Sequence, residues 1–170
     1  MVGRRILISA ILLLVAVLIE VTVLAPLDLP GATPSLVLVV IVILAGQFGA
    51  TTGAVAGFAG GLLLDIAPPA AGTIGVSALL LTVVGYATGR FAESDDRPWW
   101  SLAIVAAIAA PLVVLAGAIV GGLLGDPRVR WDEVLGLMLT SAGYALALGL
   151  VLALPLRRLC RWVVPEAYSR

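Results

Sequence analysis

The chain has 170 residues, of which 62% are hydrophobic and 12% charged, and its ten basic and ten acidic residues balance to a net charge of zero. Soluble domains are about 45–50% apolar and about 25% charged, so this composition indicates an integral membrane protein. A balanced charge also gives no reason to expect nucleic acid as a partner. The single cysteine, Cys160, excludes an internal disulfide and a cysteine-based metal site. We expect neither a metal nor a cofactor.

Long apolar runs predict the membrane spans in chain order, because a helix needs about 20 apolar residues to cross a bilayer. Glu20 and Pro26 make the first run a span rather than a cleaved signal peptide. Residues 35–64 carry no charge, and as one helix they would be about 45 Å long. The segment is either one steeply tilted helix or two short helices with a break at Gly46–Gly49. The predicted spans are approximately 6–25, 35–47, 49–65, 73–91, 101–124 and 134–156, followed by a short tail, 157–170.

The distribution of arginine supports this count of six, because cytoplasmic loops are enriched in basic residues. Six spans with a cytoplasmic N-terminus place eight arginines inside and only two, Arg128 and Arg130, outside. Five spans would place four arginines inside and six outside. We therefore predict an all-α integral membrane protein with six transmembrane helices in one bundle. It lies in the cell membrane as a single domain, with both termini cytoplasmic.

Glycine recurs at every fourth position from Gly49 through Gly53 and Gly57 to Gly61, and the next step of four reaches Asp65. Within lipid, small residues let helix backbones approach closely. The stripe therefore predicts a helix-packing groove. Its occupant is another helix of the same chain, a helix of a partner protein, or a ligand.

Two carboxylates stand out. Asp65 is predicted at the C-terminal end of a helix, where the helix dipole disfavours negative charge. Its compensating partner is expected to be Arg128 or Arg130, the backbone N–H groups of the following loop, or water. Glu20 lies inside the first span and either faces the bundle interior or a partner, or reaches to the membrane surface. The sequence contains no nucleophile–base pair and no metal-binding motif, so we do not expect an enzyme.

Three motifs resemble the rod shape-determining protein MreD family. They are G-x-x-x-G-F-x-x-G-L-x-x-D at Gly53–Asp65, G-x-x-A-L at Gly75–Leu79 and G-Y-x-x-G-R at Gly85–Arg90. The similarity covers about residues 15–92, although family members often carry glutamine where Glu20 stands. The resemblance implies a non-enzymatic scaffold and regulator of bacterial cell-wall elongation. Its implied partners are the bitopic protein MreC, the wall polymerase and transpeptidase pair, the actin-like MreB, and membrane lipids.

The same family is similar to the substrate-binding subunits of energy-coupling-factor vitamin transporters, which supplies an alternative function. A vitamin binder would need polar and aromatic side chains converging on an outward-facing cavity. The available residues are Glu20, Thr22, Gln47, Thr73, Ser77, Tyr86, Thr140, Ser141 and Tyr144.

Overall fold

A computed structural model describes residues 2–27, 30–67, 74–92, 98, 100–126 and 129–163, and contains no strand over these ranges. The expected all-α class is confirmed. Helix α1 (Val2–Ile19) continues into a π-helical turn, η1 (Glu20–Leu24), and a 3-10 turn, η2 (Ala25–Leu27). The others are α2 (Leu36–Phe48), α3 (Ala50–Ile66), α4 (Val76–Phe91), α5 (Ser101–Leu123) and α6 (Trp131–Val163).

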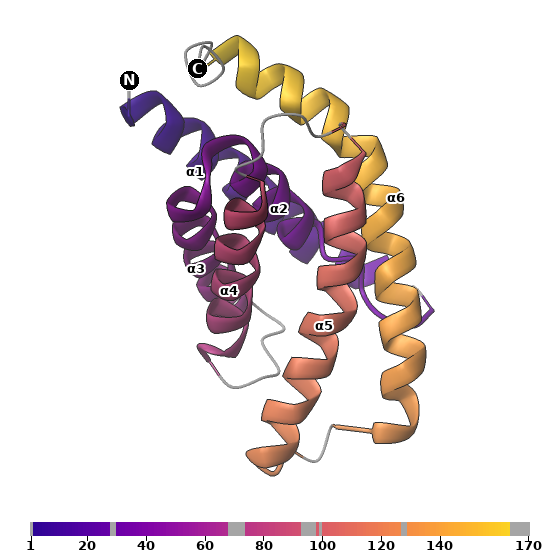
Figure 1. Ribbon diagram of the computed structural model, residues 1–170. Coiled ribbons are helices and arrows are strands. Elements are labelled where there is room, and N and C mark those ends of the chain that lie inside the picture. The colour runs from indigo at the N-terminus through magenta and orange to yellow at the C-terminus, as the bar shows by residue number, and fades with distance from the viewer. Residues whose placement is uncertain are drawn as a thin grey trace.

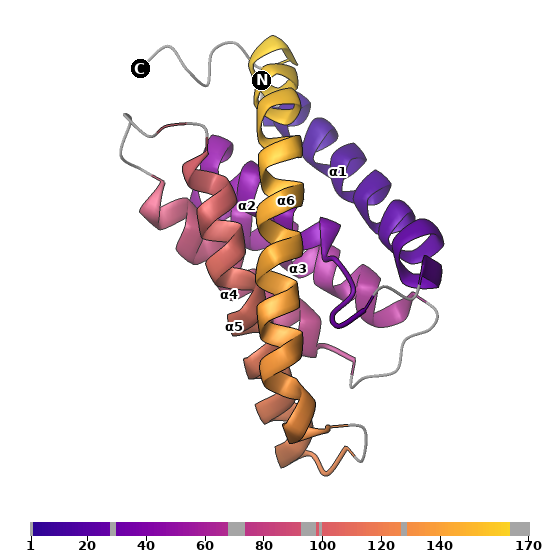
Figure 2. The same ribbon diagram turned by 90° about the vertical axis from the view of Figure 1, so that its right-hand side faces the viewer.

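The helices run alternately up and down, so that the start of α1 and the end of α6 lie at the same end of the bundle (Figures 1 and 2). Helices α5 and α6 pack against each other as a long hairpin. The far end of this hairpin extends beyond α3 and α4 in both views. Helices α3 and α4 form the other closely packed pair.

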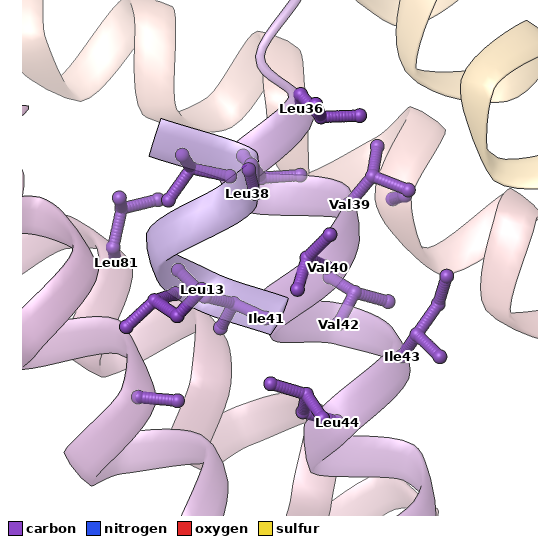
Figure 3. Packing of buried hydrophobic residues seen from close by; sticks show 14 of the residues in the cluster. Leu13, Leu36, Leu38, Val39, Val40, Ile41, Val42, Ile43, Leu44 and Leu81 are labelled. Atoms are coloured by element: carbon purple, nitrogen blue, oxygen red, sulfur yellow. The ribbon is translucent and has the colours of Figure 1, made fainter. Parts of the chain in front are cut away.

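Helix α2 is the centre of the fold. Every residue from Leu36 to Ala45 is buried, and the helix contacts α1, α3, α4, α5 and α6. Figure 3 shows its side chains meeting Leu13 of α1 and Leu81 of α4. A helix that is apolar on all sides is either enclosed by protein or exposed to lipid, and the contacts of α2 with all five other helices show that it is enclosed. Its 13 residues give a length of about 20 Å.

The break expected at Gly46–Gly49 is confirmed and falls at Gly49. This residue has φ of 87°, a conformation that favours glycine. Its N–H donates to the Ala45 carbonyl at 2.9 Å, at the end of α2. Its own carbonyl accepts from the N–H of Gly53 at 3.0 Å, in the first turn of α3. A single residue thus reverses the chain between two helices.

Within the described residues, three helical segments are long and apolar enough to cross a membrane, namely Gly3–Leu27, Ser101–Leu123 and Trp131–Cys160. Helices α2, α3 and α4 are apolar but shorter. Large apolar side chains are exposed along α1, α5 and α6, including Leu14, Ile108 and Val151. Such surfaces are suited to lipid rather than to water, which supports a membrane protein. The count of six spans and their orientation stay predictions.

We expect single cysteines at positions 97 and 170 to react with a thiol reagent only from the cytoplasm, and one at position 128 only from the periplasm. These three positions lie outside the described residues. Cys160→Ser provides the background, and the native thiol is itself buried. Impermeant maleimide labelling of intact cells, before and after permeabilisation, measures the topology. Labelling of position 97 in intact cells would contradict six spans.

Candidate functional site

The glycine stripe of α3 lies directly against the backbone of α4. A Cβ atom added at Gly53, Gly57 or Gly61 would come within 3.0 Å of backbone atoms of Gly85, Leu81 or Ala78, respectively. Side chains at these positions would therefore push the two helices apart. The groove is filled by another helix of the same chain, which confirms the first of the three alternatives.

Helix α4 contributes its own glycines to the contact. A Cβ atom at Gly85 would come within 3.0 Å of the Gly53 carbonyl, and one at Gly89 would come equally close to the Ala50 backbone. We call this contact the α3–α4 seam. It consists of Gly53, Gly57, Gly61, Ala78, Gly85 and Gly89. Close backbone approach of this kind is how helices associate in lipid.

Gly49 does not belong to the seam, contrary to the prediction. A Cβ atom there would have no neighbour within 4 Å, because Gly49 forms the turn before α3. The suggestion that the groove receives a partner helix is also wrong for Gly53, Gly57 and Gly61, because α4 occupies it. The periodicity alone cannot distinguish a turn glycine from the first glycine of a helical stripe.

Gly60 adds a second small face to α3 that the four-residue spacing did not reveal. A Cβ atom at Gly60 would lie 2.9 Å from Leu13, 3.0 Å from Val37 and 3.4 Å from Ile41. Helix α3 therefore fits closely against α4 on one side and against α1 and α2 on another. The adjacent pair Gly60–Gly61 was the available signal for two packing faces.

Asp65 closes the N-terminus of α4. One carboxylate oxygen, Oδ2, accepts from the N–H of Gly75 at 2.7 Å and from the N–H of Ala78 at 3.3 Å. The prediction that loop backbone groups compensate this carboxylate is confirmed. The positive end of the α4 dipole favours the charge, which offsets its unfavourable place at the end of α3.

Arg130, one of the two arginines expected near Asp65, is paired elsewhere. Arg130 pairs with Glu133 in the first turn of α6, and both side chains are largely exposed. Arg128 lies outside the described residues. Exposed ion pairs of this type contribute about 0–1 kcal/mol to stability, so the Arg130–Glu133 pair is a minor feature of the fold.

Glu20 caps the N-terminus of α2, as Asp65 caps that of α4. It is half-buried at the start of the π-helical turn, and its Oε2 accepts from the N–H of Val37 at 2.7 Å. The Ser35 hydroxyl oxygen accepts from the N–H of Leu38 at 3.3 Å, so two acceptors serve the first turn of α2. Of the two alternatives, the inward orientation is confirmed. Helix ends in an apolar medium need such partners, because unsatisfied backbone groups are costly there.

The segment before α2 is held against α6. The N–H of Ala32 donates to the Thr140 hydroxyl at 3.0 Å, and the Tyr144 hydroxyl donates to the Pro30 carbonyl at 3.2 Å. A Cβ atom at Gly31, which has φ of 89°, would come within 3.0 Å of Thr140. Gly31 is therefore a packed position rather than a free loop residue.

Most described polar side chains considered for a ligand cavity bind the protein's own backbone. Thr22 donates to the Leu18 carbonyl at 2.6 Å and Ser141 to the Met138 carbonyl at 2.9 Å. Tyr86 is 53% exposed on α4. Thr73 lies outside the described residues. Over the described ranges, no group of three or more histidine, cysteine, aspartate or glutamate residues could hold a metal.

The candidate site is therefore the α3–α4 seam with Asp65, which caps α4, together with Glu20, which caps α2. Its chemistry is that of helix association and backbone capping. No protein-family model, no curated protein and no solved structure matches the chain.

Proposed function

We propose that the chain is a non-enzymatic scaffold and regulator of bacterial cell-wall elongation, of the MreD kind. The observation that carries the proposal is the coincidence of its three sequence motifs with one physical unit. Across the seam, Gly61 of the first motif meets Ala78 of the second, and Gly53 of the first motif meets Gly85 of the third. Asp65, the last residue of the first motif, caps the helix on which the other two lie.

A scaffold of this kind needs a rigid interior and outer faces free for partners. The seam and the enclosed α2 supply rigidity, while α1, α5 and α6 present exposed apolar side chains. We propose that these outer faces meet the MreC span and the wall polymerase and transpeptidase pair, with lipid elsewhere. MreB would approach from the cytoplasmic side, where both termini are expected.

The vitamin-transporter alternative has less support. Glu20 and Thr140, two of its candidate ligands, accept from the backbone N–H groups of Val37 and Ala32. Tyr144 is hydrogen-bonded to the Pro30 carbonyl. These groups hold helix ends and a connecting segment in place. A substrate would have to displace those bonds, and the freed backbone groups would then be left unsatisfied.

A detergent pull-down of the tagged full-length chain tests the class of function. We expect MreC and a wall polymerase or transpeptidase to co-purify. The Gly57→Leu variant, which disrupts the seam, should recover less of both at equal bait loading. Recovery of an ATPase-coupled transporter module in place of the wall proteins would overturn the proposal.

The double variant Glu20→Gln, Asp65→Asn separates the two functions in cells. Each amide keeps an oxygen that can accept from Val37 or from Gly75, so both caps persist without charge. We expect rod shape and wall-precursor incorporation to be retained when this variant replaces the native chain. A vitamin binder that uses these charges would instead lose uptake of labelled vitamin. Lost uptake with normal wall growth would refute the scaffold.

A further inference from the structure

Arginines gather where the bundle brings its first and last helices together. Arg4 and Arg5 lie in the first turns of α1, and Arg157 and Arg158 lie near the end of α6. Both views place these two helix ends at the same end of the bundle, and α1 and α6 are in contact (Figures 1 and 2). Arg4 and Arg158 are exposed, whereas Arg5 and Arg157 are half-buried. We call these four residues the arginine cluster.

The placement of Arg4 and Arg5 is unfavourable without an anion. The N-terminus of a helix carries partial positive charge, and the first turn of α1 contains no acidic residue to balance it. On α6 the dipole has the opposite sign and favours the two arginines there. The unfavourable electrostatic interaction in the cluster is therefore that of Arg4 and Arg5 with the positive end of the α1 dipole.

Buried polar atoms without a hydrogen-bond partner also occur on the helix segments at this end of the bundle. Among the described residues, the buried side-chain polar atoms that lack a hydrogen-bond partner are Nε of Arg157, Oγ of Ser9 and Oγ of Ser101. Ser9 is only 8% exposed and lies one turn after Arg5 on the same face of α1. Ser101 begins α5, whose first turn is at this end of the bundle (Figure 1). Buried polar groups in proteins normally have a hydrogen-bond partner, so these three atoms are exceptions.

We propose that the arginine cluster binds the phosphate of an anionic phospholipid headgroup. The phosphate charge balances Arg4 and Arg5 at the positive end of α1, and an arginine guanidinium can bind a phosphate group through two parallel N–H donors. A lipid is favoured over a soluble anion because apolar side chains flank the cluster on both helices. Ile6 and Leu7 are 64% and 61% exposed, and Trp162 is 85% exposed, as acyl-chain and interfacial contacts require.

Native mass spectrometry of the full-length chain in detergent tests this proposal. Micelles supplemented with phosphatidylglycerol should give a retained lipid adduct, and phosphatidylcholine at equal concentration should not. Replacing Arg5 and Arg157 by glutamine should weaken the apparent affinity by about fivefold per arginine, since each basic residue near an anionic surface contributes about 1 kcal/mol. Arg130→Gln, at the opposite end and already paired with Glu133, is the matched control and should leave the adduct unchanged.

Two further measurements distinguish a specific lipid site from non-specific electrostatic attraction. Arg157→Lys keeps the charge but lacks the planar, bidentate donor geometry of the guanidinium, so it should retain less lipid than the native chain. Millimolar inorganic phosphate should not displace the adduct. Equal retention of both lipids, an equal loss in Arg130→Gln, full retention in Arg157→Lys, or displacement by inorganic phosphate would each overturn the proposal. The test uses the purified chain without protein partners, so its outcome is independent of the pull-down.

Discussion

Gly57→Ala is expected to lower the free energy of unfolding by about 1–3 kcal/mol, although it adds only one methyl group. The new Cβ atom would come within 3.0 Å of the Leu81 carbonyl and of the Thr82 amide nitrogen. Both obstacles are backbone atoms, which cannot rotate away as a side chain would. Relief requires α3 and α4 to separate, and separation weakens contacts along the whole seam. Reversible unfolding in mixed micelles, titrated with a denaturing detergent, measures the change.

Gly143→Ala is the matched control for this substitution. Gly143 also lies within a helix, α6, but a Cβ atom there would have no neighbour within 4 Å. Both replacements gain the same intrinsic helix preference of about 1 kcal/mol, so the difference between them isolates packing. We expect Gly143→Ala to be neutral or slightly stabilising. Equal stability of the two variants would show that the seam is not a tight contact.

Asp65→Leu is expected to destabilise the chain by about 1–3 kcal/mol, because it leaves the N–H groups of Gly75 and Ala78 without an acceptor. Ala78 belongs to the seam, so a frayed first turn of α4 also disturbs the helix contact. We further expect weaker recovery of MreC, since the seam holds the proposed scaffold in shape. Unfolding titration and quantitative pull-down are the measurements.

Asp65→Asn distinguishes capping from charge. The amide oxygen can still accept from Gly75, so this variant should stay within about 1 kcal/mol of the native chain. Arg130→Gln should be similarly mild, because that arginine pairs with Glu133 and not with Asp65. If Asp65→Asn were as damaging as Asp65→Leu, the negative charge itself would be required and the capping explanation would fail.

Local sequence signals predicted the positions of most helices, although α6 continues to Val163, into the segment predicted as a tail. The break between α2 and α3 followed from the glycines flanking Gln47 and Phe48, because a helix of 30 uncharged residues exceeds the bilayer. The packing role of Gly53, Gly57 and Gly61 followed from their spacing, because residues four apart share one helix face. Asp65 stood out in the sequence because a carboxylate is unfavourable at the C-terminal end of a helix. Its hydrogen-bond partners lie only 10 and 13 residues further along the chain.

Relations between distant segments were not accessible in the same way. Glu20 acts on Val37 because α1 and α2 fold back on each other. Gly31 looks like an unconstrained loop residue in the sequence, and its contact with Thr140 spans more than 100 residues. Nor did hydropathy separate α2 from its neighbours, because enclosed and lipid-facing helices are both apolar. Which helix is central depends on the arrangement of all six.

The enclosure of α2 has a consequence for how the protein is made. Segments emerge from the ribosome in N-to-C order, so α2 is made before α5 and α6, which cover part of it in the folded chain. If α2 is one of the six predicted spans, we expect acyl chains to occupy that surface until the last hairpin arrives. A helix of about 20 Å is shorter than the hydrocarbon layer of about 30 Å, so we expect local thinning of the bilayer around it during this interval. Packing of α5 and α6 against α2 would relieve that deformation, so that burial of the centre depends on synthesis of residues 101–163.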